Sequence, residues 1–77
     1  MTGDKLNEIK HKIIQPRIEK FVFDYEKNQI RHYITYCEEC VEEINEILKY
    51  HKVPEDTFIE LSNRYRIEIQ DRIRKIM

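Results

Sequence analysis

Apolar residues recur every three or four positions on both sides of Pro54, and this spacing most constrains the fold. Before Pro54 the pattern repeats every seven residues, and three positions of the repeat are apolar. The first position is occupied by Ile30, Cys37 and Ile44, the second by Tyr33, Cys40 and Ile47, and the third by Ile34, Val41 and Leu48. After Pro54 the apolar set is Phe58, Leu61, Tyr65, Ile69, Ile73 and Ile76. These periods are typical of amphipathic α-helices. A chain with one glycine in 77 residues also lacks the turn residues that a many-stranded sheet needs. The sequence therefore predicts an all-α protein.

The two apolar sets also match each other if the chain folds back near Val53. An antiparallel pairing joins Ile47 or Leu48 with Phe58, Ile44 with Leu61, Val41 with Tyr65, Cys37 with Ile69, Tyr33 with Ile73 and Ile30 with Ile76. The same register places Glu39 near Arg66 and Glu42 near Arg64, which are opposite in charge. We therefore expect an antiparallel helical hairpin, with one apolar seam between its two helices.

Two prolines, Pro16 and Pro54, mark the expected ends of helices, because proline disfavours helix in the preceding residue and begins one well. We expect a short N-terminal helix at about residues 4–14, a long central helix at about 17–50 and a C-terminal helix at about 55–76. All three belong to a single domain over residues 1–77. A competing interpretation breaks the long helix at residues 26–29 and gives three helices of roughly equal length. It places Pro16 inside a helix, which costs about 3 kcal/mol or a kink.

Several apolar residues have no partner in this arrangement. Phe23 lies away from its helix's apolar face, and Ile59 and Ile67 lie off the face that contains Phe58. The central stripe is also wider than a two-helix seam requires. We therefore expect the hairpins to associate as a homodimer and form a helical bundle.

Acidic residues are concentrated in one part of the chain. The net charge is −1, yet residues 38–60 contain two basic and eight acidic residues. The acids that face away from the seam or begin the next helix are Glu38, Glu39, Glu42, Glu43, Glu46, Glu55 and Asp56. A surface of one sign attracts a surface of the other and raises association rates. These seven residues are the predicted binding face for a partner protein with a basic surface.

The C-terminal helix carries a basic set that offers an alternative function, nucleic-acid binding. This set consists of Arg64, Arg66, Arg72, Arg74 and Lys75. Glu68 and Asp71 interrupt it, and the whole chain is close to neutral, whereas nucleic-acid-binding domains are usually strongly basic. The protein-binding interpretation is therefore preferred.

The Cys37-x-x-Cys40 motif suggests a zinc or redox-responsive switch as another alternative. On a straight helix, however, His32 and His51 lie about 12 and 16 Å along the axis from Cys40, too far to complete a zinc site. A thioredoxin-like role needs a preceding strand, which the sequence does not predict. Both cysteines are interpreted as small apolar core residues. No metal or other cofactor is expected.

Catalysis is not expected, because a thin helical hairpin provides little concavity and Ser62 is the only serine. Without a long apolar run or a secretory signal, a cytoplasmic protein with no membrane segment is expected. The composition, with 13 isoleucines and no alanine, is typical of AT-rich coding sequence, as in phages or low-GC bacteria. These observations together predict a small non-enzymatic regulator or inhibitor, such as an antirepressor or a counter-defence protein.

Overall fold

The computed structural model of the protein describes residues 3–28 and 32–76, and nearly all of them are helical. The elements are α1 (Gly3–Glu8), the π-helical segment η1 (Ile9–Ile14), α2 (Gln15–Asn28), α3 (Tyr33–Tyr50) and α4 (Glu55–Ile76). The first three follow one another without a gap and are called the first helix below. Over the residues that the structure describes there is no strand, so the all-α prediction is confirmed.

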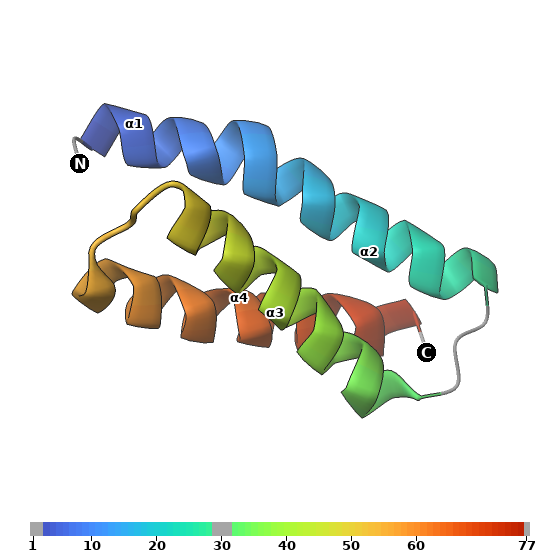
Figure 1. Ribbon diagram of the computed structural model, residues 1–77. Coiled ribbons are helices and arrows are strands. Elements are labelled where there is room, and N and C mark those ends of the chain that lie inside the picture. Colours follow the sequence, from blue (N-terminus) through green and yellow to red (C-terminus); the bar gives the residue numbers. More distant parts are fainter. Residues whose placement is uncertain (1–2, 29–31, 77) are drawn as a thin grey trace.

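The chain reverses direction at each connection (Figure 1). The first helix and α4 run one way, and α3 runs the opposite way between them in sequence. Most contacts between different helices join α3 to α4, and α2 also packs against α4. The result is an elongated bundle of 39 × 19 × 18 Å, with the two chain ends at opposite ends (Figure 1).

The prediction that the helix is broken at Pro16 is wrong, because helix continues from Gly3 through Pro16 to Asn28. Proline has no N–H group, and its ring clashes with the carbonyl group four residues earlier in an α-helix. Here the preceding turn is π-helical, and the N–H of Gln15 donates to the carbonyl of Lys10, five residues back. The wider turn lets the chain pass through Pro16 without ending the helix.

The predicted long helix over residues 17–50 is also wrong. Helix α2 ends at Asn28, where the Asn28 side chain donates to the carbonyl of Asp24 (3.0 Å), and His32 is not helical. The arrangement found is the competing one, with three long helical stretches. Its advantage is burial: α4 is too short to cover the start of a long central helix, so the chain folds back and brings the apolar face of α2 to the core. Gln29 and Ile30, together with the predicted pairing of Ile30 with Ile76, lie outside the described residues.

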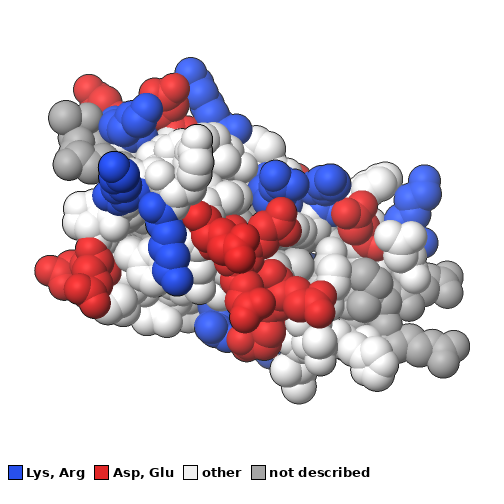
Figure 2. Space-filling model, in the orientation of Figure 1, with Lys and Arg blue, Asp and Glu red and all other residues white. Residues whose placement is uncertain are grey.

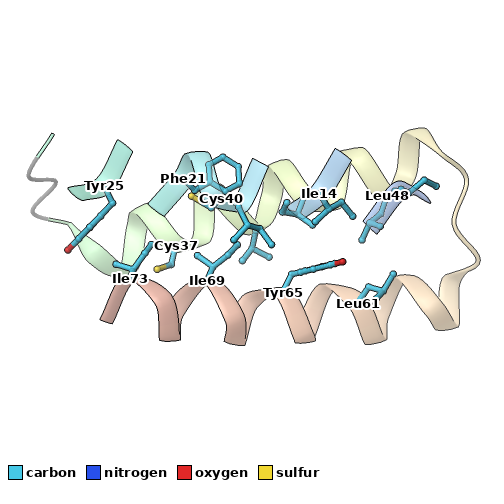
Figure 3. Close-up of a cluster of buried hydrophobic side chains, with 14 residues drawn as sticks. Ile14, Phe21, Tyr25, Cys37, Cys40, Leu48, Leu61, Tyr65, Ile69 and Ile73 are labelled. Atoms are coloured by element: carbon cyan, nitrogen blue, oxygen red, sulfur yellow. The ribbon is translucent and has the colours of Figure 1, made fainter. Parts of the chain in front are cut away.

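All three helical stretches contribute to one apolar core, shown in Figure 3. The buried residues are Ile9, Ile14, Ile18, Phe21, Tyr25, Cys37, Cys40, Val41, Ile44, Leu48, Leu61, Tyr65, Ile69 and Ile73. Ile9 and Ile14 are five positions apart, yet both are buried, because the π-helical turn places residues with this spacing on one face. Two expectations fail: Ile34, assigned to the apolar stripe of α3, is 73% exposed, and Ile76, assigned to that of α4, is 38% exposed.

The connection from α3 to α4 is a helix-ending motif with two backbone hydrogen bonds. The N–H of Val53 donates to the carbonyl of Leu48 (3.1 Å), and the N–H of Lys52 donates to that of Lys49 (3.0 Å). Lys52 has φ of 57°, a left-handed conformation usually taken by glycine at this position. The motif reverses the chain within a few residues and places Val53 against the core. It allows α4 to run back along α3.

Candidate protein-binding face

Helix α3 has one face in the core and another in solvent. Cys37, Cys40, Val41, Ile44 and Leu48 are buried, in the three-and-four spacing of one helical face. On the opposite side three carboxylates are exposed: Glu39, Glu42 and Glu46. None of the three forms an ion pair or side-chain hydrogen bond with any residue that the structure describes. We call Glu39, Glu42 and Glu46 the acidic face.

The other two predicted acids of α3 lie at its flanks and are paired with neighbouring helices. Glu38 bonds to Arg66 of α4, and Glu43 lies 3.4 Å from Arg17 of α2. The expected contact between Glu39 and Arg66 is therefore wrong by one position. One residue rotates a side chain by about 100° around the helix, so Glu38 reaches α4 while Glu39 faces outward.

The expected contact between Glu42 and Arg64 is also wrong. Arg64 pairs instead with Glu60 one turn away on α4, at 3.4 Å. This local pair leaves Glu42 in solvent with no cation of the described chain beside it.

Glu55 and Asp56 are exposed in the first turn of α4 and do not continue the acidic face. Figure 2 shows acidic side chains in a central group over α3 and in a separate group at the end where α4 begins. Lys49 and Glu55 line the same shallow groove between α3 and α4. The predicted seven-residue surface is thus divided, and its unpaired, contiguous part is the acidic face of α3.

The position of α3 in the bundle is set by contacts from its tyrosines. The hydroxyl of Tyr36 donates to the backbone carbonyl of Phe21 in α2 (2.7 Å), and its ring lies 5.5 Å from that of Tyr25, centre to centre. Burial is the main reason that the pKa of Tyr36 is raised, so this hydroxyl keeps its proton. On the other side, the hydroxyl of Tyr33 donates to the carbonyl of Gln70 in α4 (3.4 Å). These contacts hold the core face inward and the acidic face outward.

A two-bond ion pair joins the first helix to α4. The guanidinium of Arg72 donates to both carboxylate oxygens of Glu19, one of them at 2.7 Å. This hydrogen bonding lowers the pKa of Glu19, because it favours the charged carboxylate. The lowered pKa keeps the pair charged to a more acidic pH, and the pair links these two helices.

The predicted basic set is largely used inside the molecule. Arg64, Arg66 and Arg72 pair with Glu60, Glu38 and Glu19 respectively. Arg74 and Lys75 are exposed at the end of α4 and form no ion pair with any described residue. A nucleic-acid interface needs a continuous run of available cations, and this helix offers only its last turn.

The two cysteines are core residues. Cys37 and Cys40 are 1% and 3% exposed and are not bonded to each other. Burial, more than any charged neighbour, raises the pKa of Cys37 and raises that of Cys40 to about 12. Both thiols are therefore neutral at physiological pH, whereas zinc binding requires thiolates. Among residues 3–28 and 32–76, no group of three or more histidine, cysteine or acidic side chains is arranged to hold a metal ion.

Several residues of the site were missed in the sequence. Arg17, Glu19 and Tyr36 act between helices, and their roles depend on how the first helix folds back. Tyr50, in contrast, could have been found from the sequence. It is an aromatic residue outside the apolar repeat of α3, a position that indicates exposure, and it is 81% exposed.

No family model, curated protein or solved structure matches the chain. Within the described ranges, every helix lacks the combination of length and apolar character that crossing a membrane requires. The function must therefore be inferred from the surface chemistry of this chain.

The buried thiols lead to a prediction about reactivity. At pH 8 the native chain should react very slowly with a thiol reagent. The shift of the Cys40 pKa from 9.0 to about 12 reduces its thiolate roughly a thousandfold. After denaturation both cysteines should react quickly, and this can be measured by absorbance with a chromogenic disulfide.

The same pKa shift gives the pH dependence of stability. Because the folded-state pKa is raised, the unfolded chain loses its thiol protons first, so stability falls as pH rises from about 9 toward about 12.

Rapid labelling of the native chain, or zinc that co-purifies with it, would contradict the assignment of these cysteines to the core.

Proposed function

We propose that this protein is a small, non-enzymatic regulator or inhibitor that binds a partner protein through the acidic face of α3. The partner presents a basic surface. The protein works as a homodimer in the cytoplasm, and occupying the basic surface of its target is how it regulates that target.

One observation supports this proposal above the others: on α3, the carboxylates that reach a neighbouring helix are paired with a cation, and those that face away from both neighbours are not. Glu38, Glu43 and Glu19 each bond to an arginine on another helix. Glu39, Glu42 and Glu46 have no such cation. Their charges do not help the fold, because like charges one helical turn apart cost a few tenths of a kcal/mol per pair. Binding to another molecule accounts for these charges better than a contribution to stability does.

The chemistry of such a face suits the recognition of a basic protein. Several carboxylates of one sign on a rigid helix raise the rate of encounter with a positive surface and disfavour acidic competitors. The residues beneath the face are packed in the core, so the carboxylates are already in position before binding. Little ordering entropy would then be lost in the helix backbone on association.

Nucleic-acid binding is the weaker alternative, because three of its five candidate cations already pair with carboxylates. Catalysis is not part of the proposal. The grooves on the described surface are shallow and open to solvent, whereas active sites are concave and exclude water.

We also propose that the homodimer forms through the outer side of α4. Ile59 and Ile67 are 52% and 60% exposed on this helix, away from its buried residues. Association of two copies here would cover both isoleucines and leave the acidic face of α3 available to the partner. Two such bundles side by side would retain the helical-bundle architecture expected from the sequence.

The role of the acidic face can be tested by charge reversal. The double variant Glu39→Lys, Glu42→Lys should remain helical, because both side chains are exposed, and should bind its partner at least about tenfold more weakly. The measurement is affinity capture from host extract, followed by quantification of the basic proteins retained. The matched control is Glu26→Lys, Asp71→Lys, which changes net charge equally at exposed acids elsewhere. Equal retention by both double variants would exclude the acidic face as the binding surface.

The proposed homodimer predicts a mass near twice 9.6 kDa in solution, measured by light scattering. Ile67→Lys should shift the protein to the monomer mass without loss of helicity, because the side chain lies outside the core. Ile34→Lys is the matched control, since Ile34 is exposed on a different helix. A wild-type protein that is monomeric at high concentration would contradict the dimer.

A further inference from the structure

A shallow groove lies beside the acidic face, between the first helix and the last turns of α3. One wall consists of Ile13 and Arg17, and the other is formed by Glu43, Glu46, Ile47 and Tyr50. Ile13 and Ile47 are half-buried and provide apolar surface, while the carboxylates provide negative charge. The groove therefore combines apolar and acidic surface next to the proposed binding face.

Tyr50 gives this groove an exposed aromatic ring. It is 81% exposed, the highest value among the large apolar side chains that the structure describes. Its ring meets that of His51 at 85°, with 5.2 Å between ring centres. The high exposure leaves at least one face of the Tyr50 ring open to solvent. The face of an aromatic ring attracts a cation.

The chain already places one guanidinium against this wall of α3. Arg17 lies 3.4 Å from Glu43, and both side chains remain partly exposed. One turn further along, Glu46 forms no ion pair with any residue that the structure describes. Glu46 and Tyr50 are four positions apart on the helix, so a carboxylate and an aromatic ring are neighbours on the same face. A second guanidinium would find there a carboxylate to bond and a ring to stack on.

We propose that this groove binds an arginine side chain of the partner protein, with Glu46 as the carboxylate and Tyr50 as the stacking ring. The inference rests on the proposed function, because it names the chemistry of the residue that the acidic face brings close. Arginine is favoured over lysine, since its planar group both stacks on a ring and bonds a carboxylate with two N–H groups. The aliphatic part of the side chain would lie against Ile13 and Ile47.

The test uses the full chain and three short peptides. An isotope-labelled sample is titrated with acetyl-Gly-Arg-Gly-amide and followed by NMR. Saturable shifts are expected in the amides of Ile47, Tyr50 and His51, with a Kd on the order of 1–10 mM. The same peptide with citrulline, which is neutral and similar in shape, should give no saturable shift. The lysine peptide should bind several-fold more weakly.

Variants then assign the contacts. Tyr50→Ala and Glu46→Gln should each weaken binding of the arginine peptide about 2- to 5-fold. Phe23→Ala is the matched control, because Phe23 is an exposed aromatic residue outside the groove, and it should change nothing. Equal binding of the arginine and citrulline peptides, or full binding by both groove variants, would overturn the proposal. The proposed function would survive that result if the double variant Glu39→Lys, Glu42→Lys still lost partner capture, since neither residue lines the groove.

Discussion

Three isoleucines of the first helix, Ile9, Ile14 and Ile18, are almost fully excluded from water, because they share one core with α3 and α4. The remaining features depend on this burial. Each fully buried side chain of this size stabilises the fold by about 1.5–3 kcal/mol, and a chain of 77 residues has few such contributions to lose. With the inner sides of all three helices committed to the core, their outer sides are the surfaces left for other molecules.

Exposed ion pairs complement the core by fixing which helix faces which. Arg17 with Glu43 joins α2 to α3, Glu38 with Arg66 joins α3 to α4, and Glu19 with Arg72 joins α2 to α4. Such exposed pairs contribute little to stability, but they disfavour arrangements that bring like charges together. They also explain why some acids of α3 are used within the fold and others are not.

The sequence predicts the core residues of α3 and α4 well, because helical periodicity is a local property. Cys37, Val41, Ile44, Leu61 and Ile69 are all buried as their spacing indicates. The path of the first helix was not predictable in the same way. It depends on a balance between the cost of Pro16 within a helix, which the π-helical turn reduces, and the burial gained when α2 folds back. That gain comes from residues far apart in the sequence.

The candidate site shows the same division between local and long-range information. Helical geometry placed Glu39, Glu42 and Glu46 outward, as the structure does. It did not show that Glu38, and not Glu39, reaches Arg66, since a shift of one residue changes the direction of a side chain by about 100°. The groove at Tyr50 includes Ile13 and Arg17 from another helix, so it follows only from the folded chain.

The fold-back of the first helix is the central claim, and the contact between Tyr25 and Tyr36 tests it most directly. Their ring centres are 5.5 Å apart in the structure, although the residues are 11 positions apart in the sequence. On one long continuous helix the same residues would be about 16 Å apart along its axis. The decisive measurement is the nuclear Overhauser effect between the two sets of ring protons in the full chain. A clear cross-peak is the predicted result, and its absence, with both rings assigned, would contradict the fold and the proposed binding surface that depends on it.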